Sequence, residues 1–320
     1  MMTPKESFFA LKEYLNSRII GQSTLIERLL IALLADGHLL VEGAPGLAKT
    51  KAVKTLAGCI EANSHRIQFT PDLLPADITG SDVYRPETNT FFFQKGPIFQ
   101  NLVLADEINR APAKVQSALL EAMGERQVTI GNQTYQLPEL FMVMATQNPI
   151  ENEGTYALPE AQLDRFLMYV KIGYPDIESE RQILSIVQAE EKREVVPPFP
   201  KIRQTVIFEA KREVLDTYMS PDLQEYLIQF VIATRNPSPY DKNLAKWISF
   251  GASPRGTIAL DIAARAMAWL NNRDYVMPSD IHSVLKDVLR HRVILSFEAK
   301  SEGYTSDQIL DMLIQKVPMP

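Results

Sequence analysis

Cysteine is nearly missing from this 320-residue chain, which contains Cys59 alone. A single cysteine cannot form an intrachain disulfide, so we exclude a disulfide-stapled secreted scaffold and interpret Cys59 as a buried thiol. Long hydrophobic runs are missing as well, because the most apolar stretch, residues 29–35, is far shorter than the roughly 20 residues that span a bilayer. The first 15 residues mix charged with apolar side chains and contain no cleavage site, so we expect no signal peptide. These absences predict a cytoplasmic protein without a membrane segment.

An excess of positive charge is also missing. The sequence has 33 Lys and Arg against 39 Asp and Glu, which gives a net charge of −6 and a pI of about 5.4. Dedicated nucleic-acid binders are basic, so nucleic acid is not an expected partner. The four histidines show no metal-ligand spacing and no serine or cysteine nucleophile motif occurs, which excludes zinc sites and hydrolytic triads. The remaining composition, 46% hydrophobic and 22% charged, is that of an ordinary globular protein.

The sequence does contain an alternation of short apolar strands with amphipathic helices. Residues 22–35 have helical apolar spacing that ends at Asp36-Gly37, and a further helix is expected over residues 113–123. Apolar runs that predict strands lie at residues 38–41, 65–69, 101–105, 141–146 and 166–172. This order predicts an α/β core with a parallel sheet that helices cover on both faces.

Two stretches interrupt the alternation with hairpin signatures. Residues 83–85 and 90–94 flank a Pro-Glu-Thr-Asn turn. Residues 127–130 and 134–137 flank Gly131-Asn132. We expect both hairpins to be insertions that project from the sheet.

The pattern becomes helical beyond a proline-dense break at residues 196–200. Ser220-Pro221 is an N-cap followed by a proline at the first helical position, and apolar residues then recur on one helix face. We therefore expect two domains, an α/β core over residues 1–190 and a small all-α domain over residues 191–320.

A phosphate-binding loop is predicted between the first strand and the helix that follows it. The segment reads Gly43-Ala44-Pro45-Gly46-Leu47-Ala48-Lys49-Thr50. Its glycine-rich backbone and the helix N-terminus suit an anion, while Lys49 can reach terminal phosphates and Thr50 offers a hydroxyl to Mg²⁺. Ala48 stands where a second glycine is expected, so a left-handed backbone there would be strained, although Gly46 could supply the flexibility instead. The alternative interpretation is a tight turn with an incidental lysine.

An acid pair, Asp106 and Glu107, ends the apolar strand at residues 102–105. Ligands bind at the carboxyl ends of strands in open α/β sheets, so Asp106 there could hold the Mg²⁺ water shell while Glu107 polarises a water. Side chains alternate along a strand, which would turn the two carboxylates toward separate tasks. The alternative is an acidic cap of the helix at residue 113, and the upstream phosphate loop favours the functional interpretation.

Three further polar residues are candidates. Asn148 follows a predicted strand, and its amide could orient a water beside a γ-phosphate or cap the loop before Pro149. Arg165 and Arg255 lie beside turns or helix starts. Arginine suits bidentate phosphate contact, but a surface ion pair is the default for a single arginine, so neither stands without further support.

The ensemble resembles the MoxR family of AAA+ ATPases over nearly the whole chain. The resemblance rests on four strings, Gly43–Thr50, Ala105-Asp106-Glu107-Ile108-Asn109-Arg110-Ala111-Pro112, Ala145-Thr146-Gln147-Asn148-Pro149 and Leu163-Asp164-Arg165-Phe166. The family tolerates alanine at the Ala48 position, which removes most of the weight of that departure. The resemblance therefore implies an AAA+ fold with a P-loop core and a small helical lid.

The resemblance also implies a role for each candidate. Lys49 and Thr50 would belong to Walker A and the acid pair to Walker B, with Thr50 and Asp106 at the metal. Asn148 looks like sensor 1, Arg165 like an arginine finger that enters the neighbouring subunit's site, and Arg255 like sensor 2, which reaches the bound phosphates from the lid. The segment with Ile20 and Gly21 resembles the adenine pocket. The implied nucleotide-binding set is Ile20, Gly21, Gly43, Ala44, Pro45, Gly46, Leu47, Ala48, Lys49, Thr50 and Lys51.

The implied cofactors are ATP and Mg²⁺, and the implied activity is ATP hydrolysis by a ring, commonly a hexamer. A water polarised by Glu107 would attack the γ-phosphate in line, while Mg²⁺, Lys49, Arg165 and Arg255 carry the developing charge. The hairpins match pore-facing insertions of this clade. The expected function is a remodelling chaperone for maturation, assembly or cofactor insertion of an unknown client. A nucleotide-gated scaffold with little hydrolysis, a metal-chelatase-like motor subunit and a DNA-remodelling motor stay open, and the acidic pI counts against the last.

Overall fold

The computed structural model describes residues 2–149, 154–192 and 197–319. Its centre is a five-stranded sheet in the order β2-β5-β8-β1-β9, in which every neighbouring pair is parallel. The strands are β2 (Ser64–Gln68), β5 (Leu102–Asp106), β8 (Met142–Gln147), β1 (Leu39–Glu42) and β9 (Met168–Lys171). All five lie at or within a residue or two of the runs predicted from the sequence.

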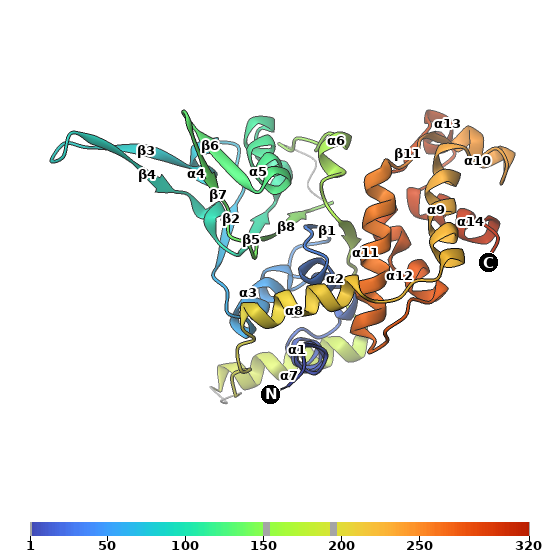
Figure 1. The fold of residues 1–320 in the computed structure, drawn as a ribbon, viewed down its shortest axis with the longest axis horizontal. Coiled ribbons are helices and arrows are strands. Elements are labelled where there is room, and N and C mark those ends of the chain that lie inside the picture. Colours follow the sequence, from blue (N-terminus) through green and yellow to red (C-terminus); the bar gives the residue numbers. More distant parts are fainter. Residues whose placement is uncertain (1, 150–153, 193–196, 320) are drawn as a thin grey trace.

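Helices cover both faces of this sheet (Figure 1). Leu102 and Leu104 of β5 face one core, which also buries apolar residues of α1 (Pro4–Arg18), α2 (Ser23–Leu34) and α3 (Lys49–Cys59). Val103 and Ala105 of β5 face a second core with α5 (Ala113–Glu125). This alternation follows from the two-residue period of a strand. The predicted doubly covered α/β core is confirmed.

Both predicted hairpins are present and project from the sheet, with β3–β4 reaching farthest in Figure 1. The first pairs β3 (Gly80–Arg85) with β4 (Thr90–Lys95), after the short helix α4 (Pro75–Thr79). The second pairs β6 (Gln127–Ile130) with β7 (Gln133–Gln136). Phe93 and Tyr135 stack with their ring centroids 4.0 Å apart, which joins the two hairpins. Short helical turns η1 (Pro97–Phe99), η2 (Ile108–Arg110) and α6 (Glu160–Leu163) complete this half.

The C-terminal part is predominantly helical, as expected. Its elements are α7 (Ile177–Glu191), α8 (Gln204–Leu215), α9 (Pro221–Arg235), α10 (Lys242–Trp247), α11 (Pro254–Leu270), α12 (Pro278–Leu289), α13 (Phe297–Ser301) and α14 (Ser306–Lys316). A small antiparallel pair, β10 (Ile248–Phe250) with β11 (Ile294–Leu295), was not expected. Of the proline-dense break, Val196 lies outside the described residues.

The division between domains at residue 190 stays a prediction. Beyond it, Ile202 forms a bridge with Ile60, and α8 packs against α1 and α2 as well as α11. In the described part of the chain no helix is long and apolar enough to cross a bilayer.

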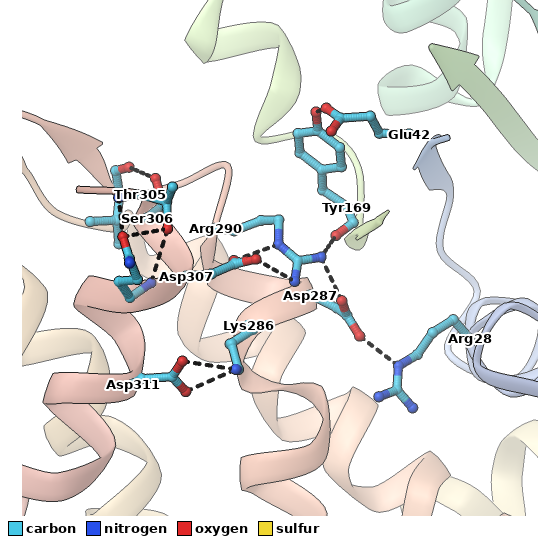
Figure 2. A network of polar contacts seen from close by, with 12 residues as sticks. Arg28, Glu42, Tyr169, Lys286, Asp287, Arg290, Thr305, Ser306, Asp307 and Asp311 are labelled. Atoms are coloured by element: carbon cyan, nitrogen blue, oxygen red, sulfur yellow. Dashed lines mark hydrogen bonds and ion pairs between the residues drawn. The ribbon is translucent and has the colours of Figure 1, made fainter. Parts of the chain in front are cut away.

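Buried polar contacts fix the helical part to the sheet (Figure 2). Arg28 of α2 donates from Nε to Asp287 Oδ2 of α12 at 2.7 Å, and both residues are buried. Arg290 follows α12, pairs with Asp287 at 2.6 Å and donates to the carbonyl oxygen of Tyr169 in β9. The Tyr169 hydroxyl in turn donates to Glu42, the last residue of β1. The C-terminal helices are thereby tied to the strands that lead into the phosphate loop.

Candidate nucleotide-binding site

The predicted phosphate loop joins β1 to α3 and has a strained backbone. Gly46 has φ +83° and Ala48 has φ +57°, so both residues are left-handed. Ala48 is the N-cap of α3, and a non-glycine residue in this conformation costs about 1–2 kcal/mol. Strain of this kind persists where the surrounding structure holds it in place, as in binding loops. The sequence left open whether Gly46 would adopt the left-handed conformation in place of Ala48, and both residues adopt it.

Lys49, the first residue of α3, folds back over the loop. Its Nζ donates to the Gly43 carbonyl oxygen at 2.6 Å. Burial lowers the pKa of the Lys49 ammonium, and the negative charges of Asp106 and Glu107 partly offset this effect. A half-buried cation at a helix N-terminus is well placed for an anionic ligand.

Thr146 holds the acid pair at the carboxyl end of β5. Its hydroxyl donates to Asp106 Oδ1 at 2.5 Å and accepts from the Glu107 backbone N–H at 2.9 Å. Thr146 is fully buried on β8, the neighbouring strand. Glu107 has φ +57°, so the chain departs from the strand direction there. The carboxylates of Asp106 and Glu107 therefore bond to different side chains.

The phosphate loop and the acid pair share one cavity of about 340 Å³, a size typical of a ligand site. It is lined by Pro45, Gly46, Leu47, Ala48, Lys49, Thr50, Lys51, Arg66, Asp106, Glu107 and Asn148. Hydroxyl and carboxylate oxygens from Thr50 and Asp106 are the ligands that Mg²⁺ prefers, and basic side chains face the space where phosphates would lie. The residues present therefore fit a nucleotide with Mg²⁺.

Two residues of β2, Arg66 and Gln68, belong to this site although the sequence motifs do not include them. Arg66 donates to Asp106 Oδ2 from Nε at 2.9 Å and from NH2 at 2.7 Å. Gln68 Nε2 donates to Glu107 Oε2 at 2.8 Å, and Arg110 pairs with the same carboxylate at 3.0 Å. The two-residue spacing near the end of a strand was visible in the sequence, but its meaning depends on β2 lying beside β5.

Ile20 and Gly21 do not line this cavity, and they lie directly before α2. The Gln22 side chain donates to the Gly173 carbonyl oxygen at 3.1 Å. A Cβ on Gly21, which has φ +75°, would lie 2.7 Å from Pro175 Cβ. A Cβ on Gly43 would lie 2.4 Å from Ile172 Cγ1, so the 172–175 segment contacts both the loop and the predicted adenine segment.

Arg165 and Arg255 lie together in a second cavity and not in the first. This cavity has a volume of about 470 Å³. Its charged lining residues are Asp36, Arg126, Asp164, Arg165, Arg255 and Arg292. Asp164 pairs with Arg292 at 2.7 Å and accepts from Ser253, the N-cap of α11, at 2.8 Å, which brings the first turn of α11 with Arg255 beside Arg165.

Arg165 rests on the last turn of α5. Its NH1 donates to the Leu120 carbonyl oxygen at 2.8 Å, and the guanidinium lies directly over Gly124. The carboxyl end of a helix carries partial negative charge, which favours a cation there. Of the predicted catalytic residues, Glu107 and Asn148 thus line the loop cavity, whereas Arg165 and Arg255 line the arginine cavity.

Comparison with known proteins places this geometry in a family. A family model described as "ATPase family associated with various cellular activities (AAA)" matches residues 38–168, and an AAA lid domain model matches residues 242–313. Chaperone MoxR1 of Mycobacterium tuberculosis is 45% identical over 305 residues, which cover 94% of this chain and 79% of that protein. The chain belongs to the MoxR family of AAA+ ATPases.

Other MoxR relatives and a solved structure agree with this assignment. Protein MoxR of Paracoccus denitrificans is 31% identical over 334 residues, covering 96% of this chain and 94% of that protein. A crystal structure of a Cytophaga hutchinsonii protein, named as a candidate ATPase, has a TM-score of 0.91 at 45% identity and covers 99% of this chain and 96% of its own. The resemblance to MoxR proteins and the AAA+ fold with a helical lid are both confirmed.

Proposed function

We propose that this MoxR-family protein binds ATP with Mg²⁺, hydrolyses it, and works as a ring-forming remodelling chaperone in the cytoplasm. The observation that carries the proposal is the single cavity in which the phosphate loop, the acid pair and Asn148 meet. A phosphate cradle beside two carboxylates and a buried amide is the arrangement that phosphoryl transfer to water requires.

Each residue at the loop cavity has a task in this proposal. The loop and Lys49 bind the phosphates, and Thr50 and Asp106 hold Mg²⁺, which when bound neutralises phosphate charge. Glu107 accepts a proton from water. The hydrogen bond from its backbone N–H to the Thr146 hydroxyl holds the Glu107 main chain in place and so positions its side chain. Asn148 is buried and lines the same cavity, where its amide can orient that water.

The placement of the arginines supports a composite site. Arg165 and Arg255 face a cavity of their own, so within one subunit neither lines the loop cavity. We infer that the arginine cavity of one subunit meets the loop cavity of the next, and that both arginines stabilise charge in the neighbour's site. An arginine supplied in trans raises phosphoryl-transfer rates by roughly 10³ to 10⁵, so an isolated subunit is expected to hydrolyse ATP poorly. A closed homo-oligomer, which we expect to be a hexamer, follows from this head-to-tail contact.

The ring would act on a client protein through its projecting hairpins. Phe91, at 71% exposure, and Tyr84 lie on the β3–β4 hairpin, where their rings pack against each other 5.3 Å apart. Exposed aromatic side chains bind protein surfaces well because they bury a large area with few rotatable bonds. We propose maturation, assembly or cofactor insertion of a partner protein as the task.

The test is ATPase activity per chain as the protein concentration rises. Activity per chain is expected to climb with concentration, and Glu107→Gln, Arg165→Ala and Arg255→Ala are each expected to abolish the climb. Arg181→Ala is the matched control, because Arg181 forms an exposed ion pair within α7 and lines neither cavity. A flat concentration dependence that none of the three variants alters would support a nucleotide-gated scaffold and refute the composite ATPase.

A further inference from the structure

Arg66 occupies an unusual place for a positively charged side chain. It extends from edge strand β2 into the loop cavity and contacts the carboxylate expected to hold Mg²⁺. Two of its nitrogens donate to the same oxygen, Asp106 Oδ2, and NH2 also donates to Gln68 Oε1 at 2.6 Å. The second carboxylate oxygen of Asp106 is bonded to Thr146. In this conformation both oxygens of Asp106 are engaged.

This ion pair conflicts with the metal site. A guanidinium on Asp106 and a divalent cation beside the same carboxylate repel each other, and they compete for its lone pairs. The Arg66 side chain is 46% exposed whereas that of Asp106 is 12% exposed, so the arginine is the partner that can move. Its long, flexible side chain starts on β2, and Arg66 lines the same cavity as Lys49, Thr50 and Asn148.

We propose that Arg66 distinguishes ATP from ADP in this site. With the loop empty, Arg66 binds Asp106 and stands in for the metal's charge. When Mg²⁺ and ATP bind, Arg66 leaves Asp106 and binds the γ-phosphate, which ADP lacks. Arginine is suited to this exchange because its planar fork binds carboxylate and phosphate oxygens in the same geometry. This inference rests on the proposed ATP site and adds a specificity-determining residue to it.

A binding assay tests the proposal without hydrolysis. The full chain is titrated with mant-ADP and with mant-AMP-PNP, a non-hydrolysable ATP analogue, across a range of Mg²⁺ concentrations. At saturating Mg²⁺, Arg66→Gln is expected to weaken mant-AMP-PNP binding about tenfold more than mant-ADP binding, because a charge-assisted contact to the last phosphate is lost. In Arg66→Gln, the Mg²⁺ concentration needed for half-maximal nucleotide binding is expected to fall, because the guanidinium that competes with Mg²⁺ for Asp106 is gone.

Two more variants make the test specific. Arg66→Lys keeps the charge but cannot place two nitrogens on one oxygen, so it should retain only part of the preference for the triphosphate, and it carries the test if Arg66→Gln fails to fold. Lys54→Gln removes the same charge from an exposed position on α3 and should leave both affinities unchanged.

The outcomes separate this inference from the proposed function. Equal weakening of both nucleotides, or no change in either, would overturn the role of Arg66, and so would an unchanged or higher Mg²⁺ requirement. A wild-type chain that binds neither nucleotide would instead overturn the ATP site itself.

Discussion

Gly124→Ala is expected to abolish most assembly-dependent ATPase activity although it touches no nucleotide. A Cβ at position 124 would lie 2.1 Å from NH1 of Arg165, closer than real contacts allow, and 3.1 Å from its Cζ. The helix backbone of α5 cannot yield, so the guanidinium must leave its place and lose its bond to the Leu120 carbonyl oxygen. Gly124 therefore positions Arg165, and it does so from inside a helix, where glycine is otherwise unfavourable.

The expected magnitudes differ sharply between stability and activity. Alanine in a helix interior gains up to about 1 kcal/mol over glycine, while losing the hydrogen bond of a half-buried arginine costs roughly 1.5 kcal/mol. The free energy of unfolding should therefore change by less than about 1 kcal/mol. Misplacing a catalytic group by an ångström can cost about 100-fold in rate, so activity should fall by that order.

The assay compares ATPase activity at high protein concentration with thermal unfolding of the same samples. Gly58→Ala is the matched control, because Gly58 lies in helix α3 and a Cβ there meets nothing within 4 Å. The Gly124→Ala change should have no further effect in an Arg165→Ala background, since both act through the same guanidinium. Wild-type activity in Gly124→Ala, or losses that add in the double variant, would refute the reasoning.

Three further predictions concern buried polar groups. Thr146→Val removes the hydroxyl that holds both members of the acid pair, so it should cost about 1–3 kcal/mol of unfolding free energy in a denaturant titration and lower kcat. Burial lowers the pKa of His38 to about 4, so on acidification the unfolded chain takes up a proton at this histidine before the folded chain does. The free energy of unfolding should therefore be highest above pH 6.5 and fall by about 2 kcal/mol at pH 5. His38→Gln should remove this pH dependence. Arg28→Met leaves Asp287 with one cationic partner fewer and should destabilise the chain by about 3 kcal/mol, measured as a lower urea midpoint with an unchanged slope.

The sheet, the hairpins and the phosphate loop could be predicted because each is encoded by neighbouring residues. Residues 102–105 are all apolar and are followed directly by two carboxylates. Gly131-Asn132 likewise marks the turn of the β6–β7 hairpin. Ser220-Pro221 likewise identified the start of α9. These signals need no knowledge of the tertiary arrangement.

The residues that the sequence did not reveal depend on contacts between distant segments. Arg66 joins the site only because β2 lies beside β5 in the sheet, an order that no local pattern specifies. The pairing of β10 with β11 brings together residues about 45 positions apart, and neither strand is long enough to show a period. The common location of Arg165 and Arg255 depends on how α11 packs beside Asp164.

Mixing two inactive variants tests the composite site most directly. Glu107→Gln leaves the arginine cavity intact, whereas Arg165→Ala leaves the loop cavity intact. In rings assembled from equal amounts of both, about a quarter of the subunit contacts would pair an intact loop cavity with an intact arginine cavity. The account predicts that the mixture recovers a substantial fraction of wild-type ATPase activity that neither variant shows alone. A mixture no more active than its separate components would contradict it.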